Sequence, residues 1–320
     1  MTITISVVIP VYRGEYSLSS LLSEIEPLTK GVAITSGEYA QITEVLLVHD
    51  CGPDRSDRVI ESLAQCYDFV RPVWLTQNYG QHAATLAGMA SASGDWIVTI
   101  DEDGQQNPKD IIGMLDFAID HHSQVVYASP VNPPPHGFIR NACSIFAKKL
   151  AMRFLGRKYE GGIFNSFRLI DGEIGRIMAA YCGNGIYLDV AIYWMASQIH
   201  YCPVTLRAES RPSGYSAFKL FNHFWRMVLC SGTGPLRLIT FCGGCSVILS
   251  FGFLFYAFYG KFISQNGVQG WTSLMVIIAF FSGMIMVSLG VVAEYLALTM
   301  GIVIGKPLYI ISSKPTRTLK

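Results

Sequence analysis

The chain has 320 residues, of which 51% are hydrophobic and 15% charged, and its formal net charge is +1. This length allows one large or two modest domains. No contiguous basic stripe with interleaved aromatic residues accompanies the near-neutral charge, so we expect no nucleic-acid partner. The eight cysteines lack the spacing of a disulfide framework, which favours reduced, buried thiols in a protein that faces the cytosol.

The first 128 residues alternate short apolar runs with helical patterns. Apolar runs rich in β-branched residues predict five strands, at residues 5–11, 45–48, 73–75, 96–100 and 125–128. A helical pattern follows each of the first four runs. Strands that are buried on both faces and alternate with helices predict an α/β fold, with a mainly parallel sheet and helices on both of its faces.

Polar residues stand where several of these strands end. Asp50 follows the second strand, Asn78 the third, and Asp101-Glu102-Asp103 the fourth. In sheets of this kind, ligands bind beyond the carboxyl ends of the strands. Carboxylate oxygens suit Mg²⁺ or Mn²⁺ and, through the metal, a nucleotide diphosphate. A carboxylate at a strand end can equally cap a helix or a turn, so both interpretations of Asp101 and Asp103 stay open.

Beyond residue 129 the pattern changes. Pro133-Pro-Pro135 interrupts any regular element, and residues 140–159 then form a basic amphipathic helical pattern. Such a helix can lie in a membrane interface or pack on the sheet with a solvated face, and the sequence does not choose between the two. A second such pattern, at residues 216–230, lies next to a long apolar stretch, which favours a position at the lipid headgroups.

Two long uncharged stretches, Leu238–Phe258 and Leu274–Ala293, come near the C-terminus. Each has about 20 residues and is long enough to cross a bilayer as a helix. Basic residues lie before the first stretch and after the second, which predicts that both flanks are cytoplasmic. We therefore expect a multi-pass protein of the inner (plasma) membrane, built from a cytosolic domain (1–212), a juxtamembrane amphipathic helix (213–235), two transmembrane helices (236–305) and a cytosolic tail (306–320).

Several short motifs follow one another in a fixed order. They are Val7-Val-Ile-Pro-Val-Tyr12, His49-Asp50 with Asp54, Gln77-Asn-Tyr-Gly-Gln81, Gly94-Asp95, Asp101-Glu-Asp-Gly-Gln-Gln-Asn-Pro108, Ser166-Phe-Arg-Leu169, and Arg211 with Gly214 and Ser216. This order resembles the family 2 glycosyltransferases of GT-A (Rossmann-like) fold over nearly the whole chain. More narrowly, the chain resembles the polyprenyl-phosphate glycosyltransferases, which include dolichol-phosphate mannose synthase and the bactoprenol glucosyltransferases.

The resemblance implies inverting transfer of a hexose-type sugar from a nucleotide sugar (a UDP or GDP donor) to polyprenyl (undecaprenyl) phosphate at the cytosolic membrane face. It implies a Mg²⁺ or Mn²⁺ ion held by Asp101 and Asp103, and a phosphate clamp at Arg211. The donor would be contacted by residues of the strand-end motifs: Pro10, Tyr12, Asp50, Asn78, Asp101, Glu102 and Gln106. The catalytic residues would be Asp103 and Arg211, with Asp189 or Glu160 as general base. The resemblance also allows a homo-oligomer.

The chain departs from the family pattern at four positions, which are His49, Cys51, Ile163 and Ala217. Because Ile163 stands where many relatives carry a candidate base, either Glu160 or Asp189 substitutes for it, or no base is used. The departures also leave a second interpretation, in which the chain is a catalytically degenerate membrane scaffold or a partner of a lipid flippase. For Arg168, the sequence leaves both a buried ion pair and a phosphate contact open.

Overall fold

The computed structural model describes residues 2–35, 37–131, 165–183, 187–207, 234–262 and 270–315. These residues fall into two compact units: the strands and helices α1 to α7 belong to one, and helices α9 and α10 to the other. The predicted interface helix at 140–159 lies outside the described residues, as do Glu160, Arg211 and nearly all of the predicted juxtamembrane segment 213–235.

In the described part of the first unit, nine strands form one sheet. Its strands are β1 (Thr2–Val11), β2 (Val32–Ala33), β3 (Tyr39–His49), β4 (Val70–Leu75), β5 (Trp96–Thr99), β6 (Val125–Pro130), β7 (Arg168–Asp171), β8 (Ile199–Val204) and β9 (Ile311–Ser312). Its helices are α1 (Leu18–Ile25), η1 (Glu26–Lys30), α2 (Ser56–Cys66), α3 (Gln81–Ser91), α4 (Asp110–Asp120), α6 (Gly172–Tyr181) and α7 (Leu188–Met195). The five predicted strands are confirmed as β1, β3, β4, β5 and β6.

The strand order is β8-β6-β7-β5-β1-β3-β4-β9, with β2 paired to β3. Strand β1 is parallel to β3 and β5, β3 is parallel to β4, and β6 is parallel to β8. Strand β7 lies between β5 and β6 and is antiparallel to both, and β9 is antiparallel to β4. The sheet is therefore mostly parallel, as predicted, but β7 and β9 were not predicted. Strand β9 lies within the segment predicted to be the cytosolic tail (306–320).

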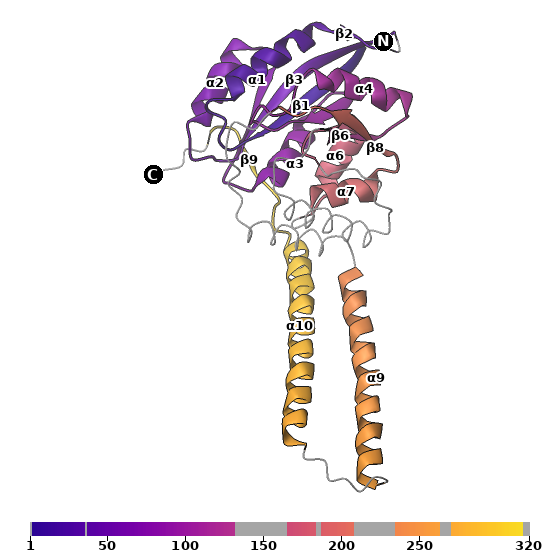
Figure 1. The fold of residues 1–320 in the computed structure, drawn as a ribbon. Coiled ribbons are helices and arrows are strands. Elements are labelled where there is room, and N and C mark those ends of the chain that lie inside the picture. The colour runs from indigo at the N-terminus through magenta and orange to yellow at the C-terminus, as the bar shows by residue number, and fades with distance from the viewer. Residues whose placement is uncertain are drawn as a thin grey trace. The chain divides into compact units, whose positions relative to one another are not determined.

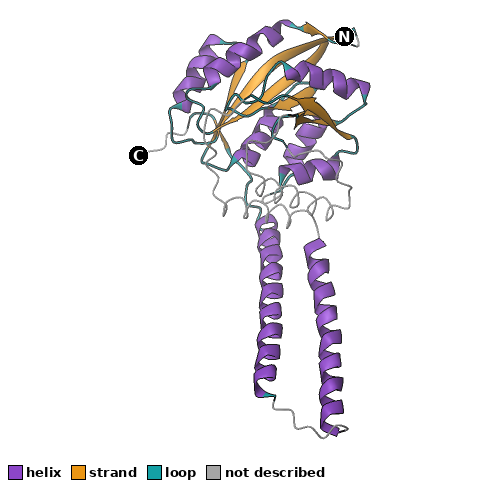
Figure 2. Cartoon of the chain, viewed as in Figure 1, coloured by secondary structure: helices purple, strands orange, loops and turns teal. Residues whose placement is uncertain are grey.

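Alternating residues of each strand pack on opposite faces of the sheet. In β1, Ile5, Val7 and Ile9 pack with the apolar sides of α1, α2 and α4, whereas Val8 packs with α3, α6 and α7. This alternation is the period of two that an extended strand imposes on its side chains. Helices therefore cover both faces of the sheet, as Figure 2 shows.

The chain changes direction within the sheet between β1 and β5. From β1 it proceeds outward to β3 and β4, and then returns to add β5 on the other side of β1 (Figure 1). In an open α/β sheet, such a reversal leaves a crevice beyond the carboxyl ends of the two strands, where ligands bind. The fold therefore positions a site at the loops that follow β1 and β5.

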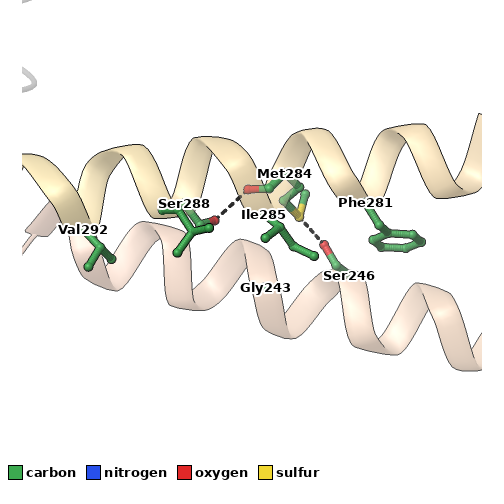
Figure 3. A pocket seen from close by; sticks show the side chains of 8 residues that line it. Gly243, Ser246, Phe281, Met284, Ile285, Ser288 and Val292 are labelled. Atoms are coloured by element: carbon green, nitrogen blue, oxygen red, sulfur yellow. Dashed lines mark hydrogen bonds between the residues drawn. The ribbon is translucent and has the colours of Figure 1, made fainter.

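The second unit contains α9 (Gly234–Phe262) and α10 (Trp271–Val303). A cavity of about 360 Å³ lies between them (Figure 3) and is lined by Gly243, Ser246, Phe281, Met284, Ile285, Ser288, Leu289 and Val292. Across the two helices, the Ser246 hydroxyl lies 2.7 Å from Met284 Sδ. No charged side chain is among the described residues that line this cavity.

Within the described part of α9 and α10, one stretch, Phe280–Val303, is long and apolar enough to cross a membrane. Its mean hydropathy is 1.8 and only 6% of it is buried. It overlaps the predicted span Leu274–Ala293 but begins and ends later in the chain. The other predicted span, Leu238–Phe258, lies inside α9, and its passage through a membrane stays a prediction.

Candidate active site

The loops after β1 and β3 lie against each other at the crevice. A Cβ atom at Gly52 would come within 1.7 Å of the Tyr12 carbonyl oxygen, so only glycine fits there. The preceding residue, Cys51, has a left-handed backbone conformation with φ of 48°. Its thiol donates a hydrogen bond to the carbonyl oxygen of Leu75, 3.0 Å away. This tight turn brings the ends of β1, β3 and β4 together.

Glu102 connects the loop after β5 to the loop after β1. Its carboxylate accepts hydrogen bonds from the backbone N–H groups of Tyr12 (3.0 Å) and Arg13 (2.9 Å). Hydrogen bonds to a charged acceptor are among the stronger ones, so they hold the two loops at a fixed spacing. The structure thus gives Glu102 a positioning role, and the donor contact expected of it stays a prediction.

Asp50 organises the loop between β4 and α3. It is 3% exposed, and its carboxylate accepts hydrogen bonds from the backbone N–H groups of Tyr79 (2.7 Å) and Gly80 (2.9 Å). Burial raises the pKa of Asp50, and the two N–H donors act against this rise. Asp50 therefore holds the loop in place, and the donor contact expected of it stays a prediction. Asn78, in the same loop, is exposed, as a donor contact requires.

Asp101 lies among polar side chains from three segments. Its Oδ1 accepts a hydrogen bond from Gln81 Nε2 (2.7 Å), and its Oδ2 accepts from Gln106 Nε2 (3.1 Å) and from the Ser166 hydroxyl. Gln106 is 4% exposed, and its Oε1 accepts a hydrogen bond from the Asp101 backbone N–H (2.8 Å). The Gln106 side chain therefore fixes Asp101, and the place in the sugar pocket expected of it stays a prediction.

Gln81 and Ser166 are site residues for which no role was predicted. Each occurs inside one of the ordered motifs, Gln81 at the end of Gln77-Asn-Tyr-Gly-Gln81 and Ser166 at the start of Ser166-Phe-Arg-Leu169. Membership of these motifs was the sequence signal that could have identified the two residues. The sequence did not reveal that both side chains contact Asp101, because the segments that carry Gln81, Asp101 and Ser166 come together only in the folded protein.

Asp101 and Asp103 are close enough for their charges to interact. Burial raises the pKa of Asp101 and repulsion from Asp103 adds to the rise, while hydrogen bonds from Ser166 and Gln106 act against it. In the described part of the chain, no three acidic, histidine or cysteine side chains gather into a metal site by themselves. Mg²⁺ commonly binds one or two carboxylates together with substrate phosphates. The two carboxylates therefore fit a divalent ion that completes its coordination with phosphate oxygens.

Arg168 and Asp189 form a buried ion pair, with each residue 4% exposed. Asp189 Oδ1 also accepts a hydrogen bond from the Tyr127 hydroxyl (2.9 Å), and Arg168 Nε donates to Thr99 Oγ1 (3.1 Å). Burial acts to lower the pKa of Arg168, but Asp189 and Tyr127 outweigh it and raise that pKa. Of the two alternatives for Arg168, a buried ion pair and a phosphate contact, the structure shows the ion pair, with Asp189 as the counter-ion. The base role expected of Asp189 stays a prediction.

The other predicted donor contacts from the first motif lie at β1. Pro10 is half-buried inside the strand, opposite Val48. Tyr12 directly follows the strand and is 40% exposed. The roles expected of Glu160 and Arg211 stay predictions, because both residues lie outside the described parts of the chain.

His49, beside this site, is expected to make the stability of the protein depend on pH. It is 2% exposed, packs edge-on against Trp74, and neither ring nitrogen has a hydrogen-bond partner among the described residues. Burial lowers the pKa of His49 below 6.5, while the carboxylates of Asp57 and Asp54 act against this fall. The unfolded chain therefore binds a proton at His49 more readily than the folded protein does. The free energy of unfolding should therefore fall as the pH is lowered below 6.5, by at most ~1.4 kcal/mol per pH unit.

Thermal unfolding at several pH values from about 7.5 to 5.5 measures this effect. His49→Phe keeps an aromatic ring against Trp74 but cannot be protonated, so its Tm should fall less on acidification than that of the wild type. Equal falls in both proteins would show that other groups cause the acid sensitivity.

Comparison with known proteins shows the family of this chain. The glycosyl transferase family 2 domain matches residues 6–178, more than half of the chain, and this range includes Asp101, Asp103 and Ser166. The chain belongs to glycosyl transferase family 2. The match begins in β1 and extends beyond β7, so it contains the crevice and the loops that border it.

Relatives of this family 2 glycosyltransferase extend the likeness to nearly its whole length. It is 30% identical over 311 residues to an undecaprenyl-phosphate 4-deoxy-4-formamido-L-arabinose transferase of Klebsiella pneumoniae, covering 96% of this chain and 92% of the relative. It is 26% identical over 314 residues to the SfII prophage-derived bactoprenol glucosyl transferase of Shigella flexneri, covering 96% and 97%. The resemblance to polyprenyl-phosphate glycosyltransferases is therefore confirmed.

Solved structures agree on the fold of the glycosyltransferase unit. Mannosyl-3-phosphoglycerate synthase from Rubrobacter xylanophilus matches with a TM-score of 0.51 at 14% identity, covering 72% of this chain and 73% of the other. Glucosyl-3-phosphoglycerate synthase from Mycobacterium tuberculosis, solved with Mn²⁺, UDP-glucose and phosphoglyceric acid, matches with a TM-score of 0.50 at 18% identity, covering 72% and 79%. At this identity the likeness shows the fold alone, which is GT-A-like.

Proposed function

We propose that this glycosyltransferase transfers a sugar from a nucleotide donor to a polyprenyl phosphate at the cytosolic face of the membrane. The observation that carries the proposal is the pair of carboxylates, Asp101 and Asp103, which follow β5 at the crevice beside β1. The likeness to undecaprenyl-phosphate sugar transferases supports the acceptor class, because it continues past the family domain and covers 96% of the chain.

The site residues would divide the work between holding a metal and orienting its ligands. A bound Mg²⁺ or Mn²⁺ would supply positive charge that offsets the charge of the donor diphosphate and of the leaving nucleoside diphosphate. Asp101 and Asp103 would hold the ion, while Gln81, Gln106 and Ser166 keep the Asp101 carboxylate oriented. An oxygen of the acceptor phosphate would attack the anomeric carbon with inversion, as the bond from that carbon to the nucleoside diphosphate breaks.

The acceptor chemistry reduces the need for a general base. A phosphate monoester is already anionic near neutral pH, so its oxygen can attack without first losing a proton. A site that acts on such an acceptor can use Asp189 as the counter-ion of Arg168 instead of as a base. Glu160 stays a predicted alternative base, and Arg211 a predicted phosphate clamp.

The position of β9 supports two membrane crossings. The chain leaves the sheet after β8 and returns to the same sheet at β9, so both ends of the intervening segment lie on one side of a membrane. A crossing by α10 then needs a second crossing to bring the chain back. The 29-residue α9 contains the uncharged stretch Leu238–Phe258 and is long enough to supply it. We therefore propose that the protein crosses the inner membrane twice and that its glycosyltransferase domain lies in the cytoplasm.

Incubation of the purified full-length protein with undecaprenyl phosphate and a panel of labelled UDP- and GDP-sugars tests this function. We expect a labelled lipid with at least one donor, and loss of the product when EDTA removes Mg²⁺ and Mn²⁺. Product formation that is unchanged in EDTA would contradict the metal role. No product with any donor would overturn the proposal and favour the membrane scaffold or flippase partner.

A further inference from the structure

The segment after α10 returns to the sheet next to the proposed donor site. Strand β9 pairs with the last residues of β4, with Ser312 opposite Trp74 and Ile311 opposite Leu75. The Thr76 backbone N–H donates to the carbonyl oxygen of Ile310 (3.1 Å), which extends the pairing to the first residue after β4. The pairing therefore ends where the loop between β4 and α3 begins.

The same loop provides the contacts that hold the site together. Thr76 Oγ1 lies 2.9 Å from the Tyr79 hydroxyl, so the paired end of β4 is hydrogen-bonded to the middle of the loop. Tyr79 and Gly80 then donate to Asp50, and Gln81 donates to Asp101. Hydrogen bonds and the backbone of residues 76–81 thus connect β9 to the carboxylate that would hold the metal.

Side-chain packing fixes the tail beside this loop. Leu308 and Tyr309 are half-buried and pack against the same apolar cluster as Tyr79, on the face of the sheet that α3 covers. The pKa of Tyr309 is raised by burial, as expected for a hydroxyl on a side chain that is partly withdrawn from water. The tail is therefore attached by side-chain burial as well as by strand pairing.

We propose that tail residues 307–312 are a positioning element for the nucleotide-sugar donor. Without β9, the carboxyl end of β4 would be an unpaired sheet edge, and the backbone of Thr76 would lose its partner. Residues 76–81 would then sample more conformations. A donor that binds to a single conformation of this loop would bind more weakly, because that conformation would be less populated. The inference rests on the proposed function, because it assigns the donor to this crevice.

Proline substitution in the full-length protein tests the tail. In the observed register the N–H of Ser312 faces Trp74, so Ser312→Pro removes a donor from the pairing. Ser313→Pro is the matched control, because residue 313 follows the strand. The probes are UDP and GDP with MnCl₂, titrated into each protein in detergent, followed by donor KM and kcat in the transfer assay. Circular dichroism checks folding.

Ser312→Pro should weaken nucleotide affinity and raise the donor KM about tenfold, while kcat at saturating donor and the lipid KM stay close to wild type. Ser313→Pro should match the wild type. A partly unfolded protein would behave differently, because it lowers the active fraction and so kcat without changing KM. Unchanged affinity in folded Ser312→Pro, or a fall in kcat alone, would overturn the inference.

Tyr79→Phe provides a milder second variant, because it removes only the hydroxyl that contacts Thr76. It should weaken nucleotide affinity, but less than Ser312→Pro does. If Ser312→Pro does not fold, Tyr79→Phe becomes the test of the inference. Wild-type affinity in Tyr79→Phe would then count against the inference. A wild-type protein that binds neither UDP nor GDP would instead overturn the proposed function itself, so the two failures can be distinguished.

Discussion

Asp103→Ala is expected to lower sugar transfer by at least ~1000-fold while the protein stays folded. A divalent ion stabilises developing charge on a leaving diphosphate by several kcal/mol, and each ~1.4 kcal/mol changes the rate tenfold. Asp103 is exposed, and its hydrogen bond to the Gln105 backbone N–H (3.0 Å) lies within one turn. Loss of its carboxylate should therefore remove a metal ligand without disturbing the core. The measurement is the transfer rate at saturating donor and metal.

Asp120→Ala is the matched control for this experiment. Asp120 is exposed at the last residue of α4 and lies outside the loops that border the crevice, so its replacement should leave transfer at the wild-type rate. The Tm of each variant shows whether it remains folded. An Asp103→Ala protein with more than about a tenth of the wild-type rate would be incompatible with a metal-binding role for this carboxylate.

Asp189→Ala is expected to destabilise the glycosyltransferase domain by about 3–5 kcal/mol, because it leaves the buried Arg168 guanidinium without its counter-ion. It also removes the acceptor of the Tyr127 hydroxyl, which is fully buried. For a domain of this size, the loss corresponds to a fall in Tm of roughly 10 °C. Thermal unfolding of the detergent-solubilised protein measures it.

A second pair of variants separates the counter-ion role from a catalytic one. Arg168→Met combined with Asp189→Leu removes both charges and should recover part of the stability that Asp189→Ala loses, because no unpaired charge is left buried. Asp189→Asn should lose stability, since an amide cannot neutralise the guanidinium. If Asp189→Asn kept the wild-type Tm and lost only turnover, the result would favour the general-base role over the counter-ion role.

The parts of the fold that were predicted correctly have local signals. The five predicted strands are runs of apolar, β-branched residues, such as Val45–Val48 in β3, and their burial on both faces follows from that composition. Asp101 and Asp103 were proposed as site residues because they directly follow such a run, and the structure places them just after β5. The order of strands and helices then placed them at a carboxyl edge of the sheet, where ligands bind.

The parts that were missed depend on partners far away in the chain. Strand β7 has four residues and β9 has two, which is too short for a periodic pattern to be recognised. Both exist because a neighbouring strand offers unpaired backbone groups: β7 fills the gap between β5 and β6, and β9 covers the end of β4. Pairing of this kind cannot be deduced from the short segment alone.

The sequence by itself determined the α/β class, the paired carboxylates at a strand end, and the family to which the chain belongs. Only the tertiary structure decided what several polar side chains bind. Asp50 and Glu102 bind loop backbones, Gln106 binds Asp101, and Asp189 pairs with Arg168. The physical reason is that a buried polar group must find a partner when it leaves water, and the partner available to it depends on which distant segments the sheet brings together.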